Sequence, residues 1–153
     1  MSKRKIFIGA DSAGFSLKEE LKSHLINLGY EVDDCGTDSE ESCHYPIFAA
    51  KVCENVQLNL NNSYGILICG TGIGMSMCAN KFNGIRAAVC SDTFSAKMTR
   101  RHNDANVLCI GARVIGSCLA TDILDIFLEN EFEDGRHGIR VAMMGDIEKN
   151  QKK

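Results

Sequence analysis

The glycine-rich segment that follows Cys69 is the part of the sequence best suited to chemistry. An apolar run from Tyr64 to Ile68 precedes this cysteine, and a loop with the sequence Gly-Thr-Gly-Ile-Gly (70–74) follows it. Such a run is typical of a buried parallel strand, and open α/β sheets bind ligands at the carboxyl ends of their strands. Glycines let backbone N–H groups approach a ligand closely. A thiol beside such donors therefore predicts an enzyme site.

The glycine loop does not match the two common nucleotide-binding motifs. The dinucleotide fingerprint requires a third glycine where this sequence has Met75, and a P-loop requires a lysine that is absent after these glycines. The loop nevertheless opens a predicted helix, whose first N–H groups favour an anion. We interpret the loop as a cradle for a small anion, and a simple strand-to-helix turn is the alternative.

Further candidate residues follow other predicted strands and helices. Asp11 follows the first strand, where it can either cap a turn or contact a ligand. His102 lies near the end of a predicted helix and is the best acid–base candidate, because histidine ordinarily titrates near neutrality. Arg136 and Arg140 share one face if their segment is helical, which suits phosphate or, alternatively, a solvated charged surface. Arg113 follows the last strand as a further cation.

Short apolar runs alternate with helical patterns along the chain, which predicts βαβ crossovers and a parallel sheet covered on both faces. The five predicted strands are 5–9, 31–34, 64–69, 86–90 and 107–110. Helices are predicted between the strands, and a last one begins near Gly138. Ser16 and Glu19 form a capping-box pattern for the first helix, and Gly29 can end it. Asp92 can cap the helix that follows the fourth strand.

The composition indicates one globular domain that spans residues 1–153. The chain is 44% hydrophobic and 24% charged, and no linker rich in proline or serine divides it. Its formal net charge of −3 does not suggest a nucleic-acid partner. No apolar stretch reaches the roughly 18 residues that span a bilayer. We therefore expect no membrane partner and a cytoplasmic location.

The eight cysteines lack the C-x-x-C spacing of common zinc and redox sites. Several lie in apolar runs, where a free cysteine behaves as a small hydrophobic residue. We therefore expect reduced, structural thiols everywhere except at Cys69, and neither a metal site nor a cofactor.

Several longer stretches resemble the ribose-5-phosphate isomerase B family, within the wider ribose/galactose isomerase group. These stretches are 65–74, 79–82, 84–87, 101–108 and 135–137, and together they run through nearly the whole chain. The resemblance implies a Rossmann-like three-layer αβα sandwich with a five-stranded parallel sheet. It also implies a homodimer or tetramer with a site shared between subunits. The implied reaction interconverts ribose 5-phosphate and ribulose 5-phosphate, in the pentose phosphate pathway and without a metal.

The same resemblance implies a role for each candidate residue. Cys69 is the base that moves a proton between C2 and C1, and His102 is the acid that opens the furanose ring, with Asp11 near the ring oxygen. Preorganised N–H donors stabilise the enediolate that forms. The implied donors are Thr71 and the amides of Gly70, Gly72, Ile73 and Gly74. The implied substrate contacts are Ser12, Asn103, Arg113, Arg136 and Arg140.

Ser12 departs from the pattern of the family, which usually has a histidine after the aspartate. A serine can donate a hydrogen bond but carries no positive charge, so the preferred sugar phosphate is left open. Two alternatives follow from this departure. One is an isomerase of allose 6-phosphate or galactose 6-phosphate, and the other is a sugar-phosphate binding protein without activity.

Overall fold

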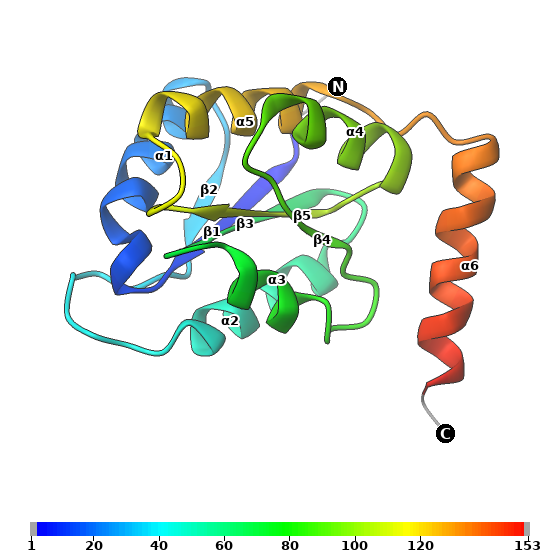
Figure 1. Cartoon of the computed structure of the whole chain (residues 1–153), viewed down its shortest axis with the longest axis horizontal. Coiled ribbons are helices and arrows are strands. Elements are labelled where there is room, and N and C mark those ends of the chain that lie inside the picture. Colours follow the sequence, from blue (N-terminus) through cyan, green and yellow to red (C-terminus); the bar gives the residue numbers. More distant parts are fainter. Residues whose placement is uncertain (1–2, 152–153) are drawn as a thin grey trace.

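The computed structural model describes residues 3–151, which form a parallel sheet of five strands with helices on both faces (Figure 1). The strands are β1 (Lys5–Ala10), β2 (Val32–Asp34), β3 (Ser63–Cys69), β4 (Ala87–Val89) and β5 (Val107–Gly111). The helices are α1 (Phe15–Asn27), α2 (Tyr45–Leu58), α3 (Ile73–Ala79), α4 (Thr93–Asn103), α5 (Ser117–Glu129) and α6 (Arg136–Asn150), and a short 3-10 turn, η1 (Ser12–Gly14), precedes α1. All five strands lie within one residue of their predicted bounds, which confirms the predicted α/β fold.

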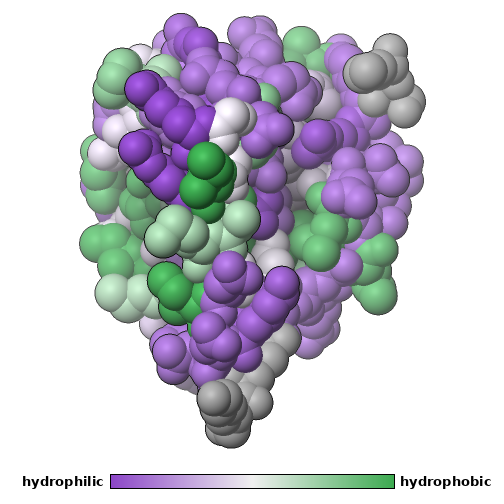
Figure 2. Space-filling view, turned by 90° about the vertical axis from the view of Figure 1, so that its right-hand side faces the viewer, coloured by the Kyte–Doolittle hydropathy of each residue, from purple (hydrophilic) through white to green (hydrophobic). Residues whose placement is uncertain are grey.

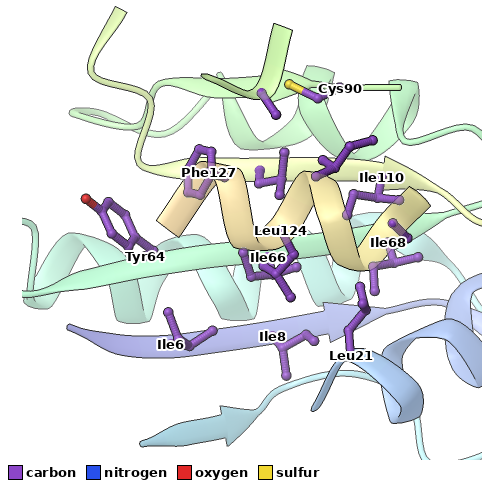
Figure 3. Packing of buried hydrophobic residues seen from close by; sticks show 14 of the residues in the cluster. Ile6, Ile8, Leu21, Tyr64, Ile66, Ile68, Cys90, Ile110, Leu124 and Phe127 are labelled. Carbon is purple, nitrogen blue, oxygen red and sulfur yellow. The ribbon is translucent and has the colours of Figure 1, made fainter. Parts of the chain in front are cut away.

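Two hydrophobic layers join the sheet to its helices. Helices α1, α4 and α5 cover one face, and α2 and α3 cover the other (Figure 1). Because side chains alternate along a strand, β3 contributes to both layers. Ile66 and Ile68 pack in the same cluster as Leu124 of α5 (Figure 3), whereas Leu67 and Cys69 belong to the layer beneath α2 and α3. The thiol of Cys69 therefore faces the α2–α3 side of the sheet.

The strand order β2-β1-β3-β5-β4 places a reversal of the chain between β1 and β3. From β1 the chain moves outward to β2 and then returns to the other side of β1, where β3 pairs with all six residues of β1. Loops that leave two such strands diverge, and the crevice between them is where open α/β sheets bind ligands. Strand β5 lies directly beside β3, so its carboxyl end borders the same crevice.

The predicted capping box of the first helix is wrong. Gly14 is the N-cap of α1, and the hydroxyl of Ser16 donates to a carboxylate oxygen of Glu40 rather than capping the helix. Helix α1 begins at Phe15, so Ser16 already lies inside the helix and cannot cap it. Asp11 caps the turn η1 before the helix by accepting from the N–H of Gly14 at 3.1 Å, which is one of its two predicted roles.

Two other predicted helix boundaries are confirmed. Gly29 follows α1 with a φ of +80°, a left-handed value that glycine adopts without steric cost. The carboxylate of Asp92 accepts from the N–H of Ser95 at 2.7 Å, which caps the start of α4. Both signals depend on residues only a few positions apart, so they can be predicted from sequence.

Helix α6 stands apart from the rest of the molecule and is held near its two ends (Figure 1). Only His137 is buried among the residues of this helix. At the other end, the carboxylate of Glu148 accepts from the N–H of Gly84 at 2.9 and 3.1 Å. A cavity of about 850 Å³ lies between α6 and the loop that precedes β4.

One stripe of α6 is both exposed and apolar. Ile139, Met143 and Ile147 recur every four residues and are 67%, 59% and 62% exposed. Figure 2 shows apolar residues among hydrophilic ones on the side of the molecule that carries α6. Exposed apolar patches are common at interaction sites. None of the helices in residues 3–151 is long and apolar enough to cross a bilayer.

Candidate functional site

Three loops meet at the carboxyl edge of the sheet. The register pairs Ala10 of β1 with Ile68 of β3, and it pairs Cys69 with Gly111 of β5. These three strands therefore end at the same level. The candidate residues that follow their ends are Asp11, Ser12, the glycine loop (70–74) and Arg113, and the structure brings them together at one crevice.

The glycine loop is held in place by the backbone and by its own side chains. The N–H of Gly72 donates to Sγ of Cys69 at 3.2 Å, and the N–H of Ile73 donates to Oγ1 of Thr71 at 3.2 Å. Gly72 has a φ of +76°, and a Cβ at this position would lie 3.0 and 3.2 Å from two backbone atoms of Ile110. Only glycine meets both conditions without strain. The thiol is thus fixed beside the loop amides.

Asp11 and Ser12 continue β1 into the same crevice. The N–H of Asp11 donates to the carbonyl of Ile68 at 3.3 Å, and one carboxylate oxygen accepts from the N–H of Gly14. The other carboxylate oxygen has no hydrogen-bond partner in residues 3–151. Ser12 is half-buried in η1. One oxygen of Asp11 is therefore available to a ligand.

Arg113 supplies a positive charge beside the glycine loop. Its N–H donates to the carbonyl of Gly70 at 3.0 Å, so the chain after β5 runs along the loop. Its guanidinium lies close to Gly70, because one terminal nitrogen would be 3.5 Å from a Cβ at that position. The side chain is exposed, and arginine in such a position can bind a phosphate through two parallel hydrogen bonds.

Tyr45 is a neighbour of the loop that sequence reasoning missed. A Cβ on Gly74 would lie 2.6 Å from Cζ of the tyrosine ring and 2.9 Å from its hydroxyl oxygen. Tyr45 begins α2, and Pro46 lies in the first turn of this helix, where proline is tolerated. No local signal indicates that α2 lies against the glycine loop, since that contact joins segments almost thirty residues apart.

A second group of candidate residues lies where α4 ends and α6 begins. The imidazole rings of His102 and His137 are stacked, with centroids 4.0 Å apart and planes within 5°. Oε2 of Glu133 lies 3.6 Å from Nε2 of His102 and 4.0 Å from Nε2 of His137. The guanidinium of Arg101 pairs with the other carboxylate oxygen. Sequence reasoning identified His102 but missed Glu133 and His137, which approach it only because α6 begins beside the end of α4.

The surroundings of His137 lower its pKa. Burial lowers its pKa below the ordinary value of 6.5, and the nearby His102, Arg136 and Arg140 lower that pKa further. Nε of Arg136 also donates to Nε2 of His137 at 3.5 Å. The predicted substrate contacts Asn103, Arg136 and Arg140 are all exposed around the stacked rings. This corner therefore presents two exposed guanidinium groups beside an imidazole pair.

The two groups of candidate residues lie at opposite ends of the strands: Cys69 is at the carboxyl end of β3, and His102 is near the amino end of β5. His102 precedes β5, whose first residue, Val107, pairs with Gly65. Cys69 pairs with Gly111 at the far end, and the four residues of strand between these levels span about 13 Å. Figure 1 shows the arrowhead of β5 pointing away from α6. One chain therefore does not bring Cys69 and His102 together.

His102, Glu133 and His137 also offer three potential metal ligands within 4.8 Å of one another. Histidine binds a metal in the plane of its ring, at about 2.0–2.1 Å from nitrogen. The two rings lie in nearly parallel planes, so no point lies in both planes at that distance. One ring must rotate before both can bind the same ion. The stacked arrangement is therefore unsuited to a metal.

Most buried thiols in the chain are poor reactants. Burial raises the pKa of Cys53 to about 12 and that of Cys90 to about 11, and it raises the pKa of Cys109 well above its usual range. A cysteine reacts as its thiolate, so these three residues act as packing. All eight cysteines are unpaired in this structure.

Comparisons with known proteins agree with this architecture. A family model described as Ribose/Galactose Isomerase matches residues 6–144. The chain is 49% identical over 145 residues to ribose-5-phosphate isomerase B of Escherichia coli (strain K12), which covers 95% of this chain and 97% of that protein.

Solved structures also resemble this chain. Ribose-5-phosphate isomerase B of Clostridium thermocellum matches with a TM-score of 0.94 and 51% identity, over 97% of this chain and 99% of that chain. Ribose-5-phosphate isomerase B of Mycoplasma genitalium, solved with bound ribulose-5-phosphate, matches with a TM-score of 0.92 and 38% identity, over 95% of this chain and 96% of that chain. The folds correspond along nearly the whole chain.

Proposed function

Because the chain belongs to the ribose/galactose isomerase family, we propose that it interconverts ribose 5-phosphate and ribulose 5-phosphate. The observation that carries this proposal is the thiol of Cys69, which the N–H of Gly72 holds at the crevice of the sheet. Aldose–ketose isomerisation needs a base between two carbons and hydrogen-bond donors for the oxygen that becomes negative. The relative with bound ribulose-5-phosphate supports this choice of substrate.

Cys69 acts as the base in the proton-transfer step. As the thiolate, it takes the proton from C2 of the open-chain aldose and returns it to C1, while the hydroxyl proton on O2 moves to O1, and the aldose becomes the ketose. Negative charge develops on the carbonyl oxygen, and the amides of Gly70 and Gly74 donate to it, whereas those of Gly72 and Ile73 donate within the loop. Oγ1 of Thr71 already accepts from the N–H of Ile73, so its own proton is free to donate to the same oxygen.

Ring opening precedes proton transfer and requires an acid. His102 gives a proton to the ring oxygen as the bond from that oxygen to C1 breaks. The C1 hydroxyl gives its proton to water as the aldehyde forms. Asp11 assists near the ring oxygen through its second carboxylate oxygen, since the first accepts from the N–H of Gly14.

Arginines near both ends of the strands are the proposed phosphate contacts. Arg113 lies beside the glycine loop, and Arg136 and Arg140 lie at the start of α6. Ser12 and Asn103 add hydrogen-bonding groups without charge. Energy from binding the distant phosphate is used to orient the carbons that react.

A second copy of the chain completes this site. The substrate is a single small sugar phosphate, yet Cys69 and His102 of one chain lie at opposite ends of the strands. In a two-fold dimer, each crevice receives His102, Arg136 and Arg140 from the other copy. The apolar stripe of α6, formed by Ile139, Met143 and Ile147, supports such a contact. We therefore propose a homodimer, or a tetramer built from two such dimers.

Two features of the chain support the proposed single domain and cytoplasmic location. Both hydrophobic layers share one sheet, which supports a single domain over residues 1–153. The eight unpaired cysteines support a reducing compartment such as the cytoplasm.

Mixed dimers test the shared site. Cys69→Ala and His102→Asn each remove one catalytic group, and we expect each purified variant to lose on the order of 10³-fold in kcat. After coexpression, about half of the dimers are mixed and each mixed dimer holds one intact site, so about a quarter of all sites regain full activity. Variants that never complement each other would contradict the shared site. A Cys69→Ala variant that retains the wild-type rate would contradict the assignment of the base.

Ser12 supports one alternative, an isomerase of a six-carbon sugar phosphate. The absence of a cation at this position changes the surroundings of Asp11 at the crevice. A panel of ribose 5-phosphate, allose 6-phosphate and galactose 6-phosphate distinguishes the candidates, because a higher kcat/KM with either hexose would overturn the pentose. Tight binding without turnover of any sugar phosphate in the panel would favour a binding protein. The presence of both Cys69 and His102 argues against that alternative.

A further inference from the structure

The corner between α4 and α6 contains a carboxylate that the proposed reaction does not use. Glu133 lies between α5 and α6, and its N–H donates to the carbonyl of Arg101 at 3.0 Å. One carboxylate oxygen pairs with the guanidinium of Arg101. The other faces the Nε2 edges of His102 and His137 at 3.6 and 4.0 Å. The carboxylate is thus fixed at the side of the proposed acid.

The stack with His137 sets the plane of the His102 ring. The two centroids are 4.0 Å apart and the planes differ by 5°. His137 is 8% exposed, and its N–H donates to the carbonyl of Asp134 at 3.1 Å, so it is a firm surface. Rotation of the His102 ring would give up the flat contact with this neighbour. The orientation of His102 therefore depends on α6.

Different charged groups lie near the rings of His102 and His137. Two stacked imidazoles cannot both hold a proton without strong repulsion. Burial, His102 and the guanidinium groups of Arg136 and Arg140 lower the pKa of His137. The carboxylate of Glu133 places a negative charge at the Nε2 edge of His102, at 3.6 Å. Arg101, on the other side of Glu133, shares that carboxylate.

We propose that Glu133 and His137 are positioning residues that orient His102 for ring opening. Glu133 holds the Nε2 edge of His102, and His137 holds its plane. Neither residue needs to touch the sugar, because both act through the ring of His102. This inference rests on the proposed function, in which His102 gives the proton to the ring oxygen.

A double-mutant cycle tests this coupling. Glu133→Gln keeps the size of the side chain and removes its charge, and we expect it to lower kcat with ribose 5-phosphate about 10-fold at an unchanged KM. In a His102→Asn background the same change should have no further effect, because no ring is left to orient. The residual rate of that background comes from free aldehyde in solution, which needs no acid.

Matched variants complete the experiment. Glu131→Gln removes a nearby exposed carboxylate that pairs with Arg4 at 3.8 Å, and it should leave kcat unchanged. His137→Phe keeps a flat ring and should retain more activity than His137→Ala, which gives a second readout if Glu133→Gln does not fold.

Two outcomes would overturn the inference. One is an equal loss of kcat from Glu133→Gln in both backgrounds, and the other is a raised KM at an unchanged kcat. A His102→Asn variant with the wild-type rate would instead reject His102 as the acid, which is a failure of the proposed function.

Discussion

The glycine loop and the corner between α4 and α6 are built in opposite ways. Backbone geometry holds the loop: Gly72 has a φ of +76°, and its N–H donates to the sulfur of Cys69. Side chains hold the corner, where His102 and His137 stack beside Glu133 on a partly exposed surface. A group held by the backbone moves only if the chain changes conformation, whereas side chains adjust by rotating.

This difference matches the roles proposed for the two regions, with the base at the glycine loop and the acid at the corner. Moving a proton between adjacent carbons requires a base placed within a fraction of an ångström, which a strand end and a tight turn provide. The proposed acid and two phosphate contacts lie near α6, the helix that stands apart from the sheet (Figure 1). Under this proposal the corner carries the acid and an apolar contact surface for a second copy, and the loop carries the base.

The largest effect should come from Gly72→Ala. A Cβ would be strained at a φ of +76° and would crowd the backbone of Ile110. We expect a loss of about 3 kcal/mol in the free energy of unfolding and a fall of about 100-fold in kcat, because the loop amides shift. Gly29→Ala, just after α1, is the control, since its φ of +80° is also left-handed but a Cβ there meets nothing within 4 Å. Equal destabilisation by both, measured by denaturant unfolding, would contradict a tightly constrained loop.

A smaller effect should come from Ile139→Asp on the apolar stripe of α6. This side chain is 67% exposed in one chain, so the change should not unfold the monomer. A charge buried without a partner between two copies should separate them and lower activity about 10-fold at micromolar enzyme. Light scattering after size exclusion measures the mass. Ile26→Asp, at a 54% exposed isoleucine of α1, should leave the mass unchanged, and a fully active Ile139→Asp monomer would refute the shared site.

The smallest effect should be the pH dependence of the corner. The pKa of His137 is lowered in the folded chain, so the unfolded chain binds more protons as the pH falls through the ordinary value of 6.5. The stability that neutral His137 contributes is therefore present above about pH 6.5 and decreases below it. Thermal unfolding of the wild type and of His137→Phe, from about pH 8 to about pH 5, measures how much His137 contributes to the pH dependence of stability. If the melting temperatures of the two proteins changed equally with pH, the lowered pKa of His137 would be contradicted.

The sequence by itself determined the local elements and the residues of the crevice. The five strands are predicted to within one residue because their apolar runs and turns involve neighbours along the chain. The caps at Gly29 and Asp92 are predictable for the same reason. Cys69 and the glycine loop follow directly, since the carboxyl end of a parallel strand and its glycines can be read from the order of the residues.

Tertiary structure alone decided which side chains meet. The capping box failed because α1 begins at Phe15, after the turn η1, so Ser16 lies inside the helix. Tyr45 against Gly74, and Glu133 and His137 around His102, are contacts between elements far apart in sequence. The pairing of β5 with β3 also separates Cys69 from His102 within one chain. Local patterns carry no information on such contacts, because packing between distant elements determines them.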